Sequence, residues 1–313
     1  MIHPVIFKEL MKRGHSGMDG VRRWDISDSR LWYVTPELIK GFRGLEEYEP
    51  YRKNIFAREL QLIQDHAQRI TTQSHNGALN IIDLGCSRGI KAEAWLQTLS
   101  PELIGTLRYC PIDISSSFVD EATQRILSLE KGKVKEVRPL VSDFNDLDTT
   151  LALCRSADFQ KHLILLLGSI ISTSEITEFL YMVSQPLLKG DTLVIGNGLR
   201  VGERFVDLAK YQHPVFSKWF FGVMRGLDFN EDEVEYNARF ANGRVEGYYK
   251  VLIDKMVRYQ GREVAFKKDD EIIVAAQYKF YDYELEEICK LYFSSVELIK
   301  DKEGEYALIV CRK

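Results

Sequence analysis

Short apolar runs alternate with longer amphipathic segments through the middle of the chain. Five runs have the length and aliphatic character of buried strands, at residues 80–85, 107–115, 137–144, 162–169 and 191–198. Segments between them repeat apolar side chains at helical spacing, at residues 89–100, 116–130 and 174–188. Strands that alternate with helices of this length indicate βαβ units, and therefore a parallel sheet covered by helices on both faces.

The pattern changes on either side of this region. Residues 1–60 contain no strand pattern and indicate helices and loops, and a helix begins near residue 61. After residue 200, an aromatic helical segment precedes strand-like runs, at residues 215–224, 247–257 and 271–280. The tail predicts a helix and two further strands, at residues 281–293, 294–301 and 306–313. We expect the last two strands to return to the main sheet, and residues 201–280 to form an inserted α+β region.

Composition and charge narrow the class of partner. The 313 residues are 45% hydrophobic, with 42 basic and 46 acidic side chains, a net charge of −4 and no basic block. This balance gives no electrostatic footprint for nucleic acid and favours a small-molecule partner. The longest apolar run, residues 163–171, is far shorter than the roughly 20 residues of a membrane span, and the N-terminus lacks a signal-peptide core. We therefore expect no membrane partner and a cytoplasmic location.

The five cysteines are spread along the sequence. They form no C-x-x-C pair and no close cluster with histidine. A zinc site would need such spacing, and a disulfide framework would need a denser pattern. We expect reduced, mostly buried thiols and no metal site.

A glycine turn between the first strand and the next helix is the strongest candidate for a ligand site. It has the pattern D-x-G-x-x-x-G, from Asp83 through Gly85 to Gly89. Glycines here let the backbone turn tightly and approach a ligand, and the helix that follows points its N-terminus at the same place. A dinucleotide fingerprint would have glycine where this chain has Ser87 and Ile90, so NAD is disfavoured.

Acidic residues follow the second and third predicted strands. Asp113 ends the second strand, where a carboxylate can accept both hydroxyl groups of a ribose. Asp143 ends the third strand, where it can accept from an adenine amine while the ring of Phe144 packs on the base. Each acid alone is an ordinary turn former or helix cap. In this order on these strands they describe an adenosine site without a phosphate clamp, as S-adenosylmethionine (SAM) requires.

Five further stretches carry a family resemblance. They are LWYVTPE at 31–37, EYEPYR at 47–52, IDLGCSRGIKAEAWL at 82–96, YCPIDISSSFVDEA at 109–122 and LLLGSIISTSE at 165–175. With them the sequence resembles the SAM-dependent histidine Nα-methyltransferases of ergothioneine biosynthesis and their relatives that act on dimethylallyltryptophan. The resemblance covers nearly the whole chain.

The resemblance implies a fold and a division into domains. The fold would be that of a class I methyltransferase: α/β and Rossmann-like, with a parallel sheet, an antiparallel C-terminal strand and an inserted α+β substrate-binding domain. Residues 61–200 and 281–313 would form the methyltransferase core. Residues 1–60 and 201–280 would form the substrate-binding domain.

The motifs also imply contacts to the cofactor, with Lys91 in the family's lysine position. Together with the acids and glycines above, the predicted SAM-binding residues are Asp83, Gly85, Cys86, Ser87, Lys91, Asp113, Ile114, Asp143, Phe144 and Gly168.

The substrate half departs from the family pattern. Ser172 stands where the family has an asparagine that helps to hold the amino acid, and Ala275 and Gln277 stand where histidine-specific members present a glutamate and a serine to the imidazole. Alanine has no hydrogen-bonding side chain, so histidine is disfavoured as the substrate. By resemblance, Tyr211 and Tyr48 are the candidate catalytic residues. The predicted substrate-binding residues are Tyr33, Tyr48, Tyr51, Ser172, Tyr211 and Gln277.

Residues and resemblance together predict a SAM-dependent methyltransferase. Its acceptor would be the amine of an amino acid or amino-acid-derived small molecule other than histidine. Two alternatives stay open: an O- or N-methyltransferase of a larger metabolite, and a SAM-binding module without catalysis.

Overall fold

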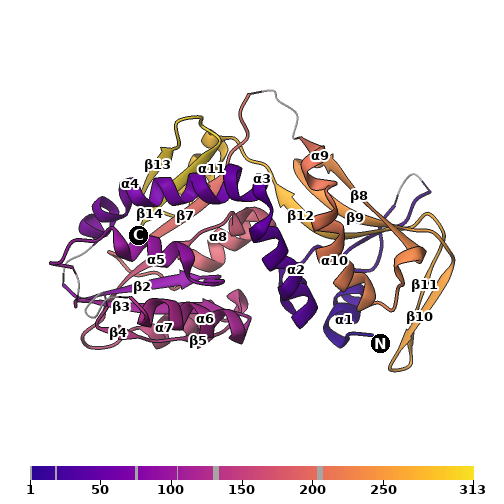
Figure 1. Cartoon of the computed structure of the whole chain (residues 1–313), viewed down its shortest axis with the longest axis horizontal. Helices are drawn as coiled ribbons and strands as arrows, with labels where there is room; N and C mark the ends of the chain where they lie inside the picture. Colours follow the sequence, from indigo (N-terminus) through magenta and orange to yellow (C-terminus); the bar gives the residue numbers. More distant parts are fainter. Residues whose placement is uncertain (1, 18–19, 75–76, 104, 130–133, 203–206) are drawn as a thin grey trace. The chain divides into compact units, whose positions relative to one another are not determined.

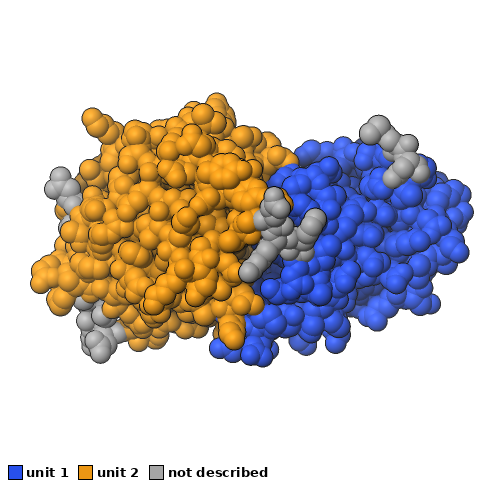
Figure 2. Space-filling model, turned by 90° about the horizontal axis from the view of Figure 1, so that it is seen from above, with its two compact units in different colours: residues 1–52, 203–279 blue, residues 53–202, 280–313 orange. Residues whose placement is uncertain are grey.

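The chain folds into two compact units in the computed structural model (Figure 1). The structure describes residues 2–17, 20–74, 77–103, 105–129, 134–202 and 207–313. Unit 1 comprises residues 1–52 and 203–279, and unit 2 comprises residues 53–202 and 280–313; Figure 2 colours them separately. These divisions fall at residues 52, 202 and 279, whereas the expected limits are 60, 200 and 280.

Unit 2 is built on a mostly parallel sheet whose strand order is β13-β14-β7-β6-β2-β3-β4, with β5 also paired to β3. Its strands are β2 (Leu79–Leu84), β3 (Leu107–Asp113), β4 (Glu136–Val137), β5 (Leu140–Val141), β6 (Lys161–Leu166), β7 (Thr192–Gly198), β13 (Ser295–Lys300) and β14 (Tyr306–Arg312). Among the strand pairs that the structure describes in this sheet, only β13–β14 and β14–β7 are antiparallel. The predicted α/β fold, Rossmann-like with antiparallel C-terminal strands, is therefore confirmed.

The third predicted strand, residues 137–144, is wrong in its extent. The structure has two strands of two residues there, β4 and β5, separated by Arg138 and Pro139. Proline has no backbone N–H to give to a sheet ladder, so the pairing with β3 stops and starts again. Asp143 consequently follows a short strand and begins the 3₁₀ helix η3 (Phe144–Asp146).

Helices cover both faces of this sheet. Consecutive side chains of a strand point to opposite faces, and both faces are buried. Ile81 packs in the cluster with α4 (Ala57–Ser74), α5 (Ile90–Gln97) and α6 (Ser116–Leu127). Its neighbour Ile82 packs in the opposite cluster, with α7 (Leu147–Cys154), α8 (Ile176–Ser184) and α11 (Asp282–Lys290). The order of the strands reverses at β2, which has β3 on one side and β6 on the other, with all three strands parallel. Ligands of such sheets bind beside this point, at the carboxyl ends of the strands.

Unit 1 has its own sheet, in the order β1-β12-β9-β8, and a separate hairpin. The sheet strands are β1 (Arg23–Asp25), β8 (Val234–Ala241), β9 (Arg244–Val251) and β12 (Glu271–Tyr278), and the hairpin strands are β10 (Lys255–Tyr259) and β11 (Arg262–Phe266). The expectation that residues 1–60 contain no strand is wrong, because β1 pairs in parallel with β12. Three residues are too few to show a period, and ion pairs of Arg22 with Asp270 and Arg23 with Glu271 fix this strand by contacts distant in sequence.

The helices of unit 1 pack around an aromatic core. They are α1 (Pro4–Arg13), η1 (Ser29–Tyr33), α2 (Pro36–Glu47), α3 (Glu49–Tyr51), α9 (Leu208–Tyr211), α10 (Pro214–Arg225) and η5 (Glu231–Glu233). The aromatic segment predicted at 215–224 is α10, and its Trp219 and Phe220 are buried against Trp32. Helix α2 approaches α10 closely at Gly41, where a Cβ would lie 2.9 Å from the Cα of Trp219. Two further elements are η2 (Arg52–Phe56) and η4 (Ile170–Thr173).

Candidate active site

The glycine turn after β2 is held to β3 by its own backbone. The N–H groups of Gly85 and Cys86 both donate to the carbonyl of Ile112, at 2.8 and 3.1 Å. Gly85 has φ +68°, and a Cβ there would lie 2.5 Å from Cδ1 of Ile170. The left-handed backbone conformation favours glycine at this position, and an added Cβ would also have to displace the end of the Ile170 side chain.

Gly89 is required for a different reason, the packing of helices. Its φ is +72°, and an added Cβ would lie 2.9 Å from Cα of Ala122 in α6. The glycine therefore lets α5 start against α6, which sets the direction of the α5 N-terminus.

Asp113, the last residue of β3, faces this turn. One carboxylate oxygen accepts from the backbone N–H of Ser87 at 3.1 Å, and the other accepts from Ser115 at 2.9 Å. Burial raises the pKa of Asp113, and the hydrogen bonds from these amides oppose that rise. Because each carboxylate oxygen has two lone pairs, both can still accept a hydroxyl group of a ligand.

Two predicted cofactor residues lie underneath the turn. Asp83 is 4% exposed and accepts a hydrogen bond from the phenol of Tyr109 at 2.8 Å. Burial raises the pKa of Asp83 to about 7. Cys86 is buried, and burial raises the pKa of its thiol, so the thiol stays protonated and non-nucleophilic at neutral pH. These two side chains support the backbone of the turn from within the core.

Apolar groups flank the turn. Ile114 is 38% exposed although it directly follows the buried strand β3. Phe144 packs edge-to-face on Phe179 with ring centroids 5.6 Å apart, and its Cζ lies 3.7 Å from the position of a Cβ on Gly85. Asp143 caps η3, with Oδ1 accepting from the N–H of Asn145 at 2.7 Å. A planar base beside Gly85 would meet the ring of Phe144, and Ile114 offers further apolar surface after β3.

A buried ion pair lies at the carboxyl ends of β6 and β7. Nζ of Lys91 is 2.6 Å from Oε2 of Glu59, and Glu59 is 0% exposed. The other oxygen of Glu59 accepts from the N–H of Gly168 at 2.8 Å. Glycines make room for both charges: a Cβ on Gly168 would lie 2.6 Å from the Lys91 Nζ, and one on Gly196 would lie 1.9 Å from the Glu59 Oε1.

Sequence reasoning missed Glu59. A signal for it exists, because Glu59 shares the buried face of α4 with Leu62 and Ile63, at helical spacing. A carboxylate in an apolar stripe needs a partner, and the partner, Lys91, lies on another helix.

Ser172, predicted to bind substrate, uses its hydroxyl within η4. Oγ donates to the carbonyl of Ser169 at 2.7 Å, and the residue is 1% exposed. It belongs to unit 2, whereas the other predicted substrate residues belong to unit 1.

The predicted tyrosines of unit 1 form aromatic contacts. Tyr48 stacks on His213 with centroids 4.3 Å apart, and Tyr211 stacks on Phe216 at 5.8 Å. Tyr33 packs edge-to-face on Phe42 at 5.5 Å. The half-buried Tyr51 packs against the aromatic core.

Strand β12 carries the two positions that depart from the family pattern. A β-bulge between Ile273 and Ala275 changes the direction of the following side chains. Ala275 packs against the aromatic core, and Gln277 accepts through Oε1 a hydrogen bond of 3.1 Å from the Tyr211 hydroxyl. The structure thus brings Tyr211 and Gln277 together.

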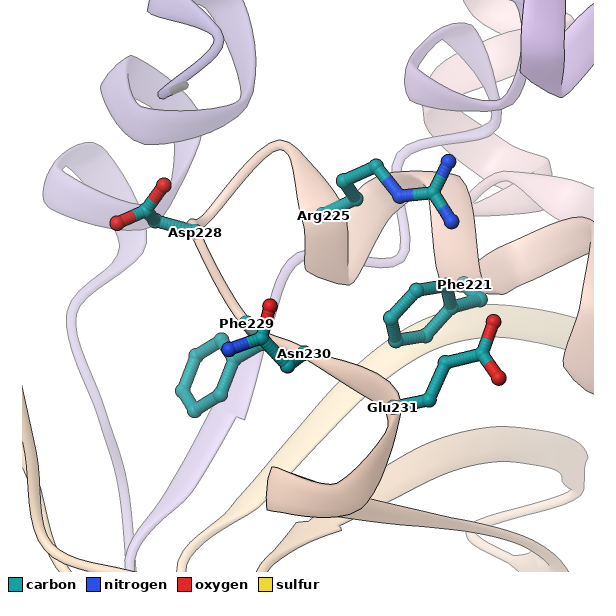
Figure 3. Close-up of a pocket in the computed structure, with 6 residues that line it drawn as sticks. All are labelled: Phe221, Arg225, Asp228, Phe229, Asn230 and Glu231. Carbon is teal, nitrogen blue, oxygen red and sulfur yellow. The ribbon is translucent and has the colours of Figure 1, made fainter.

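A hollow of about 260 Å³ also lies in unit 1, near the end of α10 (Figure 3). Its lining residues are Phe221, Arg225, Asp228, Phe229, Asn230 and Glu231. The guanidinium of Arg225 lies over the ring of Phe221, 5.2 Å from its centroid, and pairs with Glu37. None of the predicted site residues lines this hollow.

The described residues contain neither a metal-ligand cluster nor a membrane-spanning helix. No three His, Cys, Asp or Glu side chains there are grouped as metal ligands. No helix in those same ranges is long and apolar enough to span a bilayer.

Several solved structures are similar to this chain. A SAM-dependent methyltransferase from Clostridium acetobutylicum ATCC 824 is 15% identical, over 84% of this chain and 96% of that one, with a TM-score of 0.46. The PH0226 protein from Pyrococcus horikoshii OT3 is 12% identical, over 87% and 98% of the two chains, with a TM-score of 0.45. CalS10, a SAM-bound amino pentose methyltransferase from Micromonospora echinaspora, is 14% identical, over 88% and 95%, with a TM-score of 0.43. A search of curated proteins found no significant match.

One protein family matches most of the sequence. The sequence model of the family described as "Histidine-specific methyltransferase, SAM-dependent" matches residues 41–313, which contain the glycine turn, both acids and the strand β12. The predicted resemblance is confirmed, and with it the enzyme class and the cofactor. The chain belongs to the SAM-dependent, histidine-specific methyltransferase family and is a SAM-dependent methyltransferase.

Proposed function

We propose that this methyltransferase N-methylates the amine of an amino acid or amino-acid-derived small molecule other than histidine. The observation that carries the proposal is the pair Ala275 and Gln277 on β12. Ala275 offers no polar group, and the amide oxygen of Gln277 is already engaged by Tyr211. An imidazole needs a partner for each ring nitrogen when it is buried, and these two positions supply no carboxylate for it.

The residues at the carboxyl ends of β2, β3 and β5 fit SAM. Asp113 keeps two oxygens available for ribose hydroxyl groups, and Gly85 has no side chain where a ligand would approach the backbone. Asp143 and Phe144 suit the amine and the face of an adenine, and Ile114 adds apolar surface. SAM, when bound, supplies an electrophilic methyl group on its sulfonium. We assign the cofactor to unit 2 on these grounds and the acceptor to unit 1.

The roles proposed for this chain's residues follow from what an amine acceptor needs. A protonated amine has no lone pair, so the acceptor amine must be neutral to attack the methyl group. The enzyme then contributes mainly by aligning this amine with the methyl group of SAM. The Tyr211 hydroxyl donates to Gln277, so its oxygen lone pairs stay available to accept an N–H of the amine. Nδ1 of His213 accepts from the N–H of Val215, so that nitrogen is not available as a base. Tyr48, stacked on His213, is assigned a positioning role.

A methyl-transfer screen tests the proposal. Purified protein is incubated with SAM and a panel of free amino acids and amines that includes histidine, tryptophan and prenylated tryptophan, and products are read by mass spectrometry. We expect a mass gain of one or more methyl groups on an amine other than histidine. Histidine as the best acceptor would overturn the interpretation of Ala275 and Gln277. A silent panel, with SAM binding intact in a calorimetric titration, would redirect the search to larger metabolites.

A further inference from the structure

Asp83 lies near the carboxyl end of β2, on the face of the sheet that α4 and α5 cover. Ile81 packs with those helices, and side chains two positions apart on a strand share a face. Ile81 pairs with Tyr109 of β3, so Tyr109 and Asp113 lie on this face as well. On the other side, β6 has the apolar Leu165 opposite Asp83. Two acids of neighbouring strands, both buried, therefore share one face of the sheet below the glycine turn.

Charged groups from the surrounding elements act on Asp83. Lys91 of α5 attracts its carboxylate, whereas Asp113 of β3 and Glu59 of α4 repel it. Lys91 is itself paired with Glu59 at 2.6 Å, and the thiol of Cys86 stays protonated and adds no charge. Of these groups, three carboxyl groups can each carry a negative charge and one ammonium carries a positive charge. Burial, together with the two neighbouring acids, raises the pKa of Asp83 to about 7, so the empty site holds a proton there near neutral pH.

SAM and its demethylated product, S-adenosylhomocysteine (SAH), differ in charge at one atom. The sulfur of SAM is a sulfonium with a permanent positive charge, and the sulfur of SAH is a neutral thioether. In both molecules this sulfur joins the ribose to the amino-acid part. In the proposed site the adenine lies at Phe144 and the ribose at Asp113, which leaves Lys91 for the amino-acid part. The sulfur would then lie over the end of β2, on the side of the sheet where Asp83 ends.

We infer that Asp83 is a specificity residue that distinguishes SAM from SAH, because the sulfonium expels its proton and the neutral thioether does not. The step is an ionisation: the carboxyl O–H bond breaks, the proton passes to the buffer, and the carboxylate that is left attracts the sulfonium. Tyr109 stabilises this carboxylate through its hydrogen bond of 2.8 Å. The inference rests on the proposed cofactor site, and it goes beyond the proposed function because it assigns how the enzyme favours its methyl donor over its product.

Calorimetric titration tests the inference in the full-length protein. SAM and SAH are titrated at about pH 6, 7 and 8 in buffers of different ionisation enthalpy, and the dependence of the heat on the buffer gives the number of protons released. Asp83→Asn is titrated in parallel, because the amino groups of the two ligands titrate equally in both proteins. Relative to this variant, we expect the wild type to release about half a proton more per SAM between pH 6 and 7, and no more per SAH. The ratio of SAM affinity to SAH affinity should rise about ten-fold more in the wild type between pH 6 and 8, the scale of one close charge–charge interaction.

Two further variants sharpen the test. Tyr109→Phe keeps the acid but removes the hydrogen bond to its carboxylate. Asp83 then holds its proton more tightly, so the pH of largest proton release should move upward. Asp120→Asn, on the exposed face of α6, removes an acid outside this face of the sheet and should match the wild type.

The outcomes separate the inference from the site on which it rests. A wild type that binds SAM but releases no more protons than Asp83→Asn overturns the inference and leaves the methyltransferase assignment standing. An unchanged pH profile of proton release in Tyr109→Phe overturns it as well, and this variant decides alone if Asp83→Asn does not fold. Failure of the wild type to bind SAM would instead overturn the proposed cofactor site.

Discussion

Glu59 and Lys91 form a buried ion pair whose atoms Oε2 and Nζ are 2.6 Å apart, and Glu59 also accepts a hydrogen bond from the N–H of Gly168. The pair joins three elements of unit 2: helix α4, the first turn of α5 and the loop after β6. Lys91 is a predicted cofactor contact, so its position depends on an acid on a different helix. The carboxyl ends of the central strands are therefore organised by a charge pair that no local motif contains.

Removing one partner of this pair should destabilise the protein strongly. Glu59→Ala leaves a lysine without its counter-charge and frees the N–H of Gly168, and we expect a loss of about 3 kcal/mol in the free energy of unfolding. Urea unfolding checks the value. The double variant Glu59→Leu with Lys91→Met removes both charges and should recover part of the loss. Equal stability of the single and double variants would show that the pair is not coupled.

Asp113 should control SAM affinity without controlling the fold. Asp113→Ala removes both acceptor oxygens, and we expect calorimetry to show SAM binding weakened by about 100-fold, since hydrogen bonds to a charged group contribute about 1.5–3 kcal/mol each. Asp120→Asn, on the exposed face of α6, is the matched control and should bind normally. Unchanged affinity in Asp113→Ala would remove this residue from the site.

Asp83 should make the free energy of unfolding depend on pH, and its raised pKa fixes the sign of that dependence. Burial raises its pKa to about 7 in the folded protein, against 3.8 for the ordinary group, so the folded state binds the proton more tightly. Its contribution to stability is complete below pH 4 and is lost as the pH rises through 7. Asp83→Asn cannot ionise, and its stability relative to wild type should increase between pH 5 and pH 8, by about 1 kcal/mol or more. Urea unfolding across this range measures the difference. A constant difference would mean that Asp83 does not titrate there.

The sequence predicts the parts of the site that local patterns encode. Gly85 and Asp113 were identifiable because each follows a buried strand at a position where a parallel sheet binds ligands. Glu59 was not identifiable in this way, because its partner Lys91 lies 32 positions away on another helix. A repeat of apolar residues within one helix says nothing about which side chain of another helix it meets. The strand β1 was missed because three residues show no alternation, and its partner strand β12 is almost 250 residues distant. Ser172 was assigned to the substrate from a motif alone, and that motif does not show that its hydroxyl bonds to Ser169.

The close approach of α2 and α10 predicts opposite effects for two glycines of one helix. In Gly41→Ala the new methyl group would lie 2.9 Å from Cα of Trp219, and we expect a loss of about 1–3 kcal/mol in stability. In Gly44→Ala nothing lies within 4 Å of the methyl group, and the better helix propensity of alanine should stabilise the protein by about 0.5–1 kcal/mol. Thermal unfolding of both variants checks the signs. If both variants lose stability, the glycines matter for helix α2 itself and not for its packing on α10.

The last prediction concerns the acceptor. The double variant Ala275→Glu with Gln277→Ser places on β12 the residue types that the family resemblance assigns to imidazole recognition. If the natural pair disfavours histidine, the new carboxylate should raise kcat/KM for histidine by about ten-fold or more, the scale of one charge-assisted hydrogen bond. The measurement is initial rates of histidine methylation, with the single variants alongside, because each supplies half of the recognition. The larger side chain at 275 enters the aromatic core, so a thermal melt must accompany the kinetics. A folded double variant that binds SAM but gains nothing toward histidine would show that other positions decide the acceptor, and would withdraw the central support for the proposed specificity.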